Sequence, residues 1–321
     1  MKFLTYDELS SSMESGRTLL HLAAFGGVFP RRTIELWRRR AKTLADYVGL
    51  YAVEGDDLLG QVLVLRIPYV FRDETGVISG IAGVATRPDQ GRAGIARSLL
   101  TEVHRRERAA GIRYSALWTN RSWGAHALYE ELGYRDVYSS PWVVHGGKTI
   151  RGPVPRRRGV RPARPADLAT VDRLHDQAAV GRLGFCRRPP GFSHVAALSG
   201  WIDPAKNLIV AEANRKLLGY AQVDRNSQRV VCGELVAPSS VVQRTLVEEV
   251  RRTASGLPYA FQHTIVTDAP ELFRDLGYSI VPRSWYVLMG NALGREWSPQ
   301  EAIRQFATDD RRFLCLAGDR F

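Results

Sequence analysis

The alternation of apolar and polar residues along the first half of the chain predicts a mixed α/β fold. Two alternating apolar runs flank an acidic turn in Tyr51–Leu65, which is typical of a β-hairpin. Before this hairpin, apolar residues recur at helical spacing in two stretches, Asp7–Phe25 and Arg31–Tyr47. After the hairpin the pattern predicts two strands and two helices in alternation: Val77–Thr86, Asp89–Ala110, Tyr114–Thr119 and Trp123–Leu132. The order β α α β β β α β α β indicates a mixed sheet with helices on both faces.

The second half of the chain repeats features of the first. Leu208–Val223 has the form of the earlier hairpin. The tripeptide Leu58–Gly60 recurs as Leu217–Gly219, and Glu131–Tyr134 resembles Asp275–Tyr278. Two such pairs in the same order and at similar offsets predict that one fold has been duplicated.

A proline- and arginine-rich stretch, Arg151–Pro165, separates the two halves. It offers almost no apolar side chain to bury, and its prolines interrupt a helix. We therefore expect a linker at 151–165 between a domain at 1–150 and a second domain at 166–321.

Composition limits the class of protein. The 321 residues include 45 Lys and Arg against 33 Asp and Glu, a net charge of +12. Only five of the basic residues are lysine, and an arginine excess fits either phosphate-bearing partners or an arginine-favouring genome. Three scattered cysteines without a Cys-x-x-Cys pair predict neither a disulfide framework nor a metal site. With no signal-like N-terminus and no membrane-length apolar run, we expect a cytoplasmic protein that does not contact a membrane.

The candidate chemistry lies between the strand that ends at Thr86 and the helix that begins near Gly94. A glycine-bearing turn at the start of a helix points several backbone N–H groups in one direction, which suits a phosphate group. Gly91 and Gly94 allow close backbone approach, and Arg92 adds a charged donor. The alternative is a tight turn whose glycines serve backbone geometry alone.

This segment resembles the acyl-CoA loop of the GCN5-related N-acetyltransferases (GNAT), Gln/Arg-x-x-Gly-x-Gly/Ala. Gly94 and Ala96 match the last two positions, whereas Gly91 stands where the family has Gln or Arg. A second segment, Ser122–Tyr134, resembles the family's motif Asn-x-x-Ala-x-x-Leu-Tyr-x-x-x-Gly-Phe, with Ser122 in place of the asparagine. The resemblance covers the first half of the chain and implies two tandem GNAT folds.

The resemblance also assigns roles to individual residues. Tyr129 would be the general acid that protonates the departing thiolate. The remaining positions would hold acetyl-CoA, the implied cosubstrate, through strand backbone, loop and following helix: Val84, Ala85, Thr86, Gln90, Gly91, Arg92, Ala93, Gly94, Ile95, Ala96, Ser122 and Ala125. For Tyr129 alone, the competing interpretation is an ordinary core tyrosine.

The sequence leaves the general base open. No carboxylate lies in Val77–Thr86, although Asp73 and Glu74 precede it. The chain looks most like the enhanced-intracellular-survival (Eis) type of N-acetyltransferase without its third domain, and in that type the terminal carboxylate serves as base. This resemblance implies that the carboxylate of Phe321 is the base.

The second half looks like a degenerate copy. Its loop position, Leu235–Leu246, has no glycine, and Phe273 stands at the tyrosine position. We therefore expect an N-acetyltransferase whose first half acts on a primary amine of a small molecule or peptide. The resemblance also implies a homo-oligomer, because homo-oligomers are common among tandem members. The alternatives are an amide synthase resembling mycothiol synthase and a non-catalytic module that senses acyl-CoA or binds nucleic acid, although no nucleic-acid motif is present.

Overall fold

The structure, a computed structural model, describes residues 1–27, 29–41, 43–139, 141–146, 159–184, 188–254, 257, 259–262, 270–283 and 285–314. They form two compact units. Of the described residues, unit 1 comprises those in Met1–Tyr138 and Tyr286–Asp309, and unit 2 comprises those in Ser139–Trp285 and 310–314. Among these residues, no helix has the length and apolar character needed to cross a lipid bilayer.

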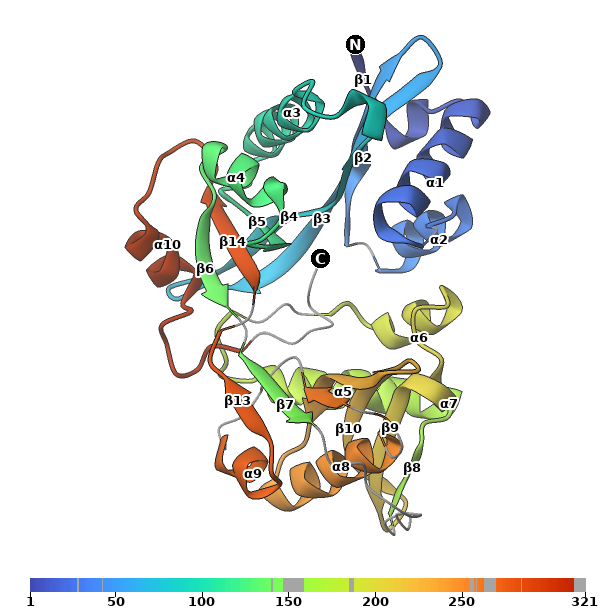
Figure 1. Cartoon of the computed structure of the whole chain (residues 1–321), viewed down its shortest axis with the longest axis vertical. Coiled ribbons are helices and arrows are strands. Elements are labelled where there is room, and N and C mark those ends of the chain that lie inside the picture. Colours follow the sequence, from blue (N-terminus) through green and yellow to red (C-terminus); the bar gives the residue numbers. More distant parts are fainter. Residues whose placement is uncertain are drawn as a thin grey trace. The chain divides into compact units, whose positions relative to one another are not determined.

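Unit 1 is built on a seven-stranded mixed sheet. In this sheet β4 and β5 run parallel, whereas β1 to β4 pair antiparallel with one another, as do β5 and β14. Helices α1 (Ser11–Phe25) and α2 (Arg31–Leu36) cover one face, and α3 (Ile95–Ala109) and α4 (Gly124–Glu131) cover the other (Figure 1). In spatial order, the strands are β1 (Lys2–Thr5), β2 (Leu44–Glu54), β3 (Asp57–Val70), β4 (Thr75–Thr86), β5 (Tyr114–Asn120), β14 (Tyr286–Ala292) and β6 (Arg135–Ser139).

Helix α3 shows how the sequence builds this core. Its apolar residues Ile95, Leu99 and Val103 fall on one face and are at most 4% exposed. The sheet meets them with Gly60 of β3, where a Cβ atom would lie 2.8 Å from Ile95 Cγ2. The glycine therefore allows the helix to pack close to the strand.

The second N-terminal helix is shorter than its periodicity predicts. We expected Arg31–Tyr47, but α2 ends at Leu36, a π-helical turn follows over Trp37–Ala41, and β2 begins at Leu44. Apolar residues in so short a stretch fit both the helical and the strand period. The residues from Leu44 onward form a strand because they pair with β3. The other predicted elements of the first half, in the predicted order, are confirmed within a few residues.

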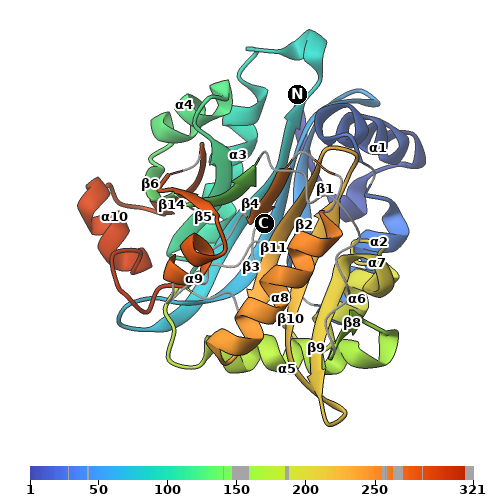
Figure 2. The same cartoon turned by 60° about the horizontal axis from the view of Figure 1, so that its bottom comes forward.

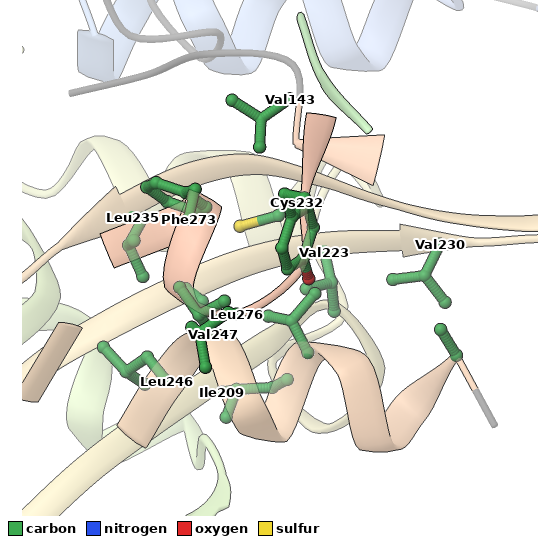
Figure 3. Packing of buried hydrophobic residues seen from close by; sticks show 14 of the residues in the cluster. Val143, Ile209, Val223, Val230, Cys232, Leu235, Leu246, Val247, Phe273 and Leu276 are labelled. Carbon is green, nitrogen blue, oxygen red and sulfur yellow. The ribbon is translucent and has the colours of Figure 1, made fainter. Parts of the chain in front are cut away.

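Unit 2 repeats the strand order of unit 1. Figure 2 shows helix α8 (Ser240–Thr253) in front of part of its sheet. Its strands in spatial order are β8 (Val160–Pro162), β9 (Leu208–Ala213), β10 (Lys216–Arg225), β11 (Arg229–Val236), β12 (Tyr259–Gln262), β7 (Trp142–Gly146) and β13 (Ser279–Val281). Its helices are α5 (Leu168–Ala179), α6 (Phe192–Leu198), α7 (Pro204–Asn207), α8 (Ser240–Thr253) and α9 (Pro270–Asp275). Figure 3 shows the buried core, in which Leu246 and Val247 of α8 and Phe273 of α9 pack on the sheet. The predicted duplication is thus seen in the topology.

The two halves exchange one strand each. β7 follows β6 in the sequence but lies between β12 and β13 in the sheet of unit 2. β14 belongs to the second half of the sequence but pairs with β5 along its whole length in unit 1. The compact units therefore do not coincide with the expected domains at 1–150 and 166–321.

The expected linker is also partly structured. Val160–Pro162 forms β8, which pairs with β9, because extended residues that include a proline fit an edge strand. Arg161 is held by Asp167 at 2.7 Å and by Glu212 at 2.7 Å, so its charge is neutralised. The rest of the arginine-rich stretch, residues 151–158, lies outside the described residues.

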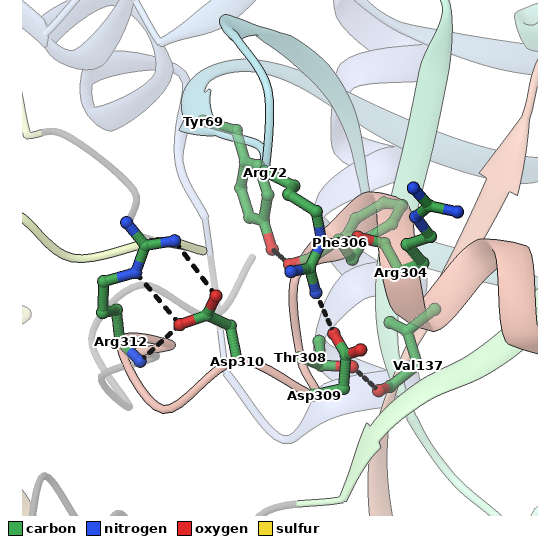
Figure 4. A network of polar contacts seen from close by, with 9 residues as sticks. All are labelled: Tyr69, Arg72, Val137, Arg304, Phe306, Thr308, Asp309, Asp310 and Arg312. Atoms are coloured by element: carbon green, nitrogen blue, oxygen red, sulfur yellow. Dashed lines mark hydrogen bonds and ion pairs between the residues drawn. The ribbon is translucent and has the colours of Figure 1, made fainter.

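The segment after β14 closes unit 1. Helix α10 (Pro299–Phe306) packs on β14, where Gly290 meets the ring of Phe306. Figure 4 shows the polar contacts that hold its end: the Tyr69 hydroxyl donates to the Phe306 carbonyl at 3.1 Å. Arg72 donates to the Arg304 carbonyl and pairs with Asp309 (Figure 4).

Candidate active site

Strands β4 and β5 separate in the middle of the sheet of unit 1. They pair in parallel only from Ile78 to Ile81 of β4. Beyond this point β4 carries a bulge, where the register with β3 shifts and Gly83 has a φ of +57°. A left-handed φ favours glycine, and a bulge turns the strand away from its neighbour. The result is a stretch of β4 whose edge toward β5 is unpaired.

The amides expected to hold the acyl arm lie on this stretch. Arg87 donates its backbone N–H to Leu59 of β3. Since backbone groups alternate along a strand, Thr86 and Val84 point their N–H groups away from β3, toward the unpaired edge, while Ala85 is paired with β3. An extended chain placed there would add a strand to β4.

The loop that follows β4 meets the requirements for a phosphate site. Gly91, Arg92, Ala93 and Gly94 are exposed, and Gly94 has a φ of +75° with nothing within 4 Å of a Cβ position. Gly94 is the N-cap of α3 and supplies no side-chain cap. The first backbone N–H groups of α3, those of Ile95 and Ala96 among them, thus have no acceptor in the described part of the chain. These residues fit the pyrophosphate of CoA, with free amides at the positive end of the helix dipole.

Other loop residues support this geometry. The N–H of Gln90 donates to the Arg87 carbonyl at 2.9 Å and so forms the turn before the helix. The N–H of Ala93 donates to Gln90 at 3.3 Å. Arg92 has a φ of +66°, and the described residues give it no ion-pair partner. Its guanidinium is available to an anionic group.

Tyr129 lies on α4 in the same buried cluster as Ile95 and Ile81. Its side chain is 7% exposed, and its hydroxyl has no hydrogen-bond partner among the described residues. Burial raises the pKa of Tyr129 to about 12. The phenol is therefore protonated at neutral pH and its hydroxyl is a free donor.

A polar chain fixes the residue against which Tyr129 packs. The ring of Tyr134 lies edge-on to Tyr129, with 5.9 Å between centroids. The Tyr134 hydroxyl contacts Ser115 Oγ at 2.8 Å and His104 Nε2 at 2.9 Å. Ser115 in turn donates to the Ser79 carbonyl, so the chain joins α3, β4 and β5. The Tyr129 ring therefore packs against a Tyr134 ring that hydrogen bonds hold in place.

The two other residues taken from the second motif lie at the start of α4. The Ser122 hydroxyl donates to Asn120 Oδ1 at 2.8 Å, which orders the turn between β5 and α4. Ala125 packs against the cluster that contains Tyr129. Ser122 therefore orders the turn, and Ala125 anchors the start of α4 to the core.

Two candidate bases lie in the wrong place, and a third lies outside the described residues. Asp73 and Glu74 precede β4, whereas the bulge is at Gly83, roughly 30 Å away along an extended strand. Glu74 is also paired with Arg113. They do not reach the bulge, because the strand between them is extended. The predicted base, the carboxylate of Phe321, falls in residues 315–321, outside the described part of the chain.

The second unit lacks the features of the first at equivalent positions. Helix α8 is capped by Ser239, whose side chain accepts from Val242 N, so one of the amides at its N-terminus is occupied. Phe273 holds the place of Tyr129: Tyr278 N–H donates to the Phe273 carbonyl just as Tyr134 N–H donates to that of Tyr129. At these equivalent positions unit 2 therefore has a side-chain cap where α3 has none, and no phenol.

One residue at the site was not predicted from the sequence, Gln61 of β3. Its side chain is fully buried, and Nε2 donates to the carbonyl of Gly83 at the bulge, at 3.2 Å. The available signal was a lone amide within an apolar strand, LLGQVLVL. No cluster of three or more His, Cys, Asp or Glu suited to a metal occurs in the described ranges.

The comparisons with known proteins agree with this geometry. Residues 6–137 match the family model described as an acetyltransferase (GNAT) domain. No curated protein matches the chain.

Three solved structures share the fold over 91% of this chain. A GCN5-related N-acetyltransferase from Kribbella flavida is 20% identical, with a TM-score of 0.64 over 71% of its length. One from Anabaena variabilis ATCC 29413 is 15% identical, with a TM-score of 0.64 over 73%. Eis1 from Mycobacterium abscessus is 16% identical, with a TM-score of 0.59 over 74%. The chain thus shares its fold with these GNAT acetyltransferases, and its residues 6–137 match the GNAT acetyltransferase domain model.

Proposed function

We propose that this protein is an acetyl-CoA-dependent N-acetyltransferase whose active site lies in unit 1. The observation that carries the proposal is the unpaired edge of β4, which leads directly into the uncapped N-terminus of α3. An extended arm with a pyrophosphate at one end matches these two features in order. The family match over residues 6–137 supports the same assignment.

The proposed reaction joins an amine to the acetyl group. The amine nitrogen attacks the thioester carbonyl, the C–N bond forms, the C–S bond breaks, and the thiol leaves with a proton. The N–H group of Val84 points to the unpaired edge, where it would stabilise the developing oxyanion. The acceptor is a primary amine of a small molecule or peptide.

Tyr129 acts at the departing sulfur in this proposal. A phenol with a pKa of about 12 is fully protonated at neutral pH, while an alkyl thiol titrates near 8.5. The phenol therefore stabilises the developing thiolate by donating a hydrogen bond as the C–S bond breaks, and the proton that the sulfur finally carries is matched by the one that the amine nitrogen loses. Because its hydroxyl has no other described partner, this donor is ready for the sulfur.

The test is release of free CoA thiol from acetyl-CoA over a panel of small amines and peptides. Tyr129→Phe removes only the hydroxyl, and we expect kcat to fall about 100-fold while the KM for acetyl-CoA stays within about twofold. Tyr69→Phe is the matched control, since it removes a buried hydroxyl that donates to the Phe306 carbonyl, and it should lower stability but not kcat. An unchanged kcat in Tyr129→Phe would remove this residue from the mechanism.

A further inference from the structure

We infer that Gln61 is a positioning residue that fixes the oxyanion donor at the β4 bulge. The inference rests on the proposed function and goes beyond the motifs, none of which includes β3. Gln61 is fully buried and faces Ala85 across the β3–β4 ladder. Its amide group reaches past this pair to the Gly83 carbonyl, at 3.2 Å.

The bulge needs such a contact because the strands leave it unsupported. Neither Gly83 nor Val84 has a partner in the register with β3, and the pairing with β5 has already ended at Ile81. Gly83 also has a left-handed φ of +57°. A peptide plane at such a position can rotate unless a side chain holds it.

Fixing the Gly83 carbonyl also fixes the Val84 amide. The two groups belong to one planar trans peptide, in which C=O and N–H point in opposite directions. Gln61 Nε2 holds the carbonyl on its own side, so the Val84 N–H points away from Gln61. This is the N–H group that the strand alternation directs to the unpaired edge of β4.

Gln61 is poorly suited to a packing role alone. Its Oε1 atom is buried without a hydrogen-bond partner among the described residues. An unsatisfied buried acceptor destabilises the folded state, and an apolar side chain of similar size would avoid that cost. The contact with the bulge is what distinguishes the amide from such a side chain.

Gln61→Met tests the inference, because methionine keeps the volume and loses the donor. We expect kcat to fall about tenfold with the KM for acetyl-CoA within about twofold, since the Val84 donor is loosened rather than removed. Leu63→Met is the matched control. Leu63 Cδ1 lies 3.2 Å from the place that a Cβ atom on Gly83 would take, but the leucine side chain cannot donate a hydrogen bond.

A second readout does not depend on turnover. Isotope-edited infrared spectra of bound acetyl-CoA are recorded without acceptor. In the wild type and in Leu63→Met, the thioester carbonyl band should lie at lower frequency than in free acetyl-CoA. In Gln61→Met this shift should be smaller. Equal kcat values and equal carbonyl bands in Gln61→Met and wild type would overturn the inference, as would an equal loss in Leu63→Met. Absence of turnover in the wild type on every amine would instead count against the proposed function, and the infrared comparison would still decide the role of Gln61.

Discussion

Acidification should destabilise unit 1 through one buried histidine. His104 of α3 contacts the Tyr134 hydroxyl with Nε2 at 2.9 Å. Burial, and to a smaller extent the positive charge of Arg108, lower the pKa of His104 to about 4. In the folded chain the His104 imidazole is therefore neutral at pH 7.

The size of the effect follows from the two pKa values. In the unfolded chain His104 titrates near 6.5, so between pH 6.5 and 4 the unfolded state binds a proton that the folded state does not. The free energy of unfolding consequently rises with pH in this window, and the contribution of His104 to it decreases as the pH falls. Between pH 7 and pH 5 the expected loss is about 1–2 kcal/mol.

Urea unfolding at pH 7 and pH 5, followed by circular dichroism, measures this loss. His104→Gln is the comparison, because glutamine does not titrate and can still hydrogen-bond the Tyr134 hydroxyl. We expect the variant to lose about 1–2 kcal/mol less than the wild type between the two pH values. If both proteins lose the same free energy, buried His104 does not set this part of the pH dependence.

Two further predictions concern glycines. Gly290→Ala would place a Cβ atom 2.6 Å from the ring of Phe306 and should lower the free energy of unfolding in urea by about 1–3 kcal/mol. When Gly290→Ala is combined with Phe306→Leu, the loss should be smaller than the sum of the two single losses. Gly94→Val forces a β-branched residue into a φ of +75° at the N-cap of α3, and isothermal calorimetry should show CoA binding weakened about tenfold. Wild-type affinity in Gly94→Val would mean that the α3 amides do not bind the pyrophosphate.

Local features of the fold were predictable from sequence. The hairpins, the strand–loop–helix at Thr86 to Gly94, and the repeated Leu-Leu-Gly all depend on neighbouring residues, whose periodicity and turn chemistry are visible along the chain. Gly60 and Gly219 then prove equivalent in space, since each faces a carbonyl of the next strand and a helix side chain. Short-range rules suffice for these elements.

Features that depend on distant residues were not predictable. The pairing of β14 with β5 joins Tyr286 to Asn120, and no local pattern distinguishes it from pairing within the second half. The same holds at the site, where the loop and Tyr129 follow a motif but Gln61 acts through a bulge on the neighbouring strand. Its role depends on strand register, which the alternation of apolar residues constrains but does not identify.

The exchanged strands have a consequence for synthesis on the ribosome. After β6 has been made, about 150 further residues must be added before β14 is available to fill the place between β5 and β6. At cellular elongation rates this takes roughly 10–30 s. Throughout that time the nascent first half presents the open edge of β5, a template for pairing with other chains. The sheet of unit 1 thus depends on a strand that is made about 150 residues after its other strands, and its folding must wait until that strand has been synthesised.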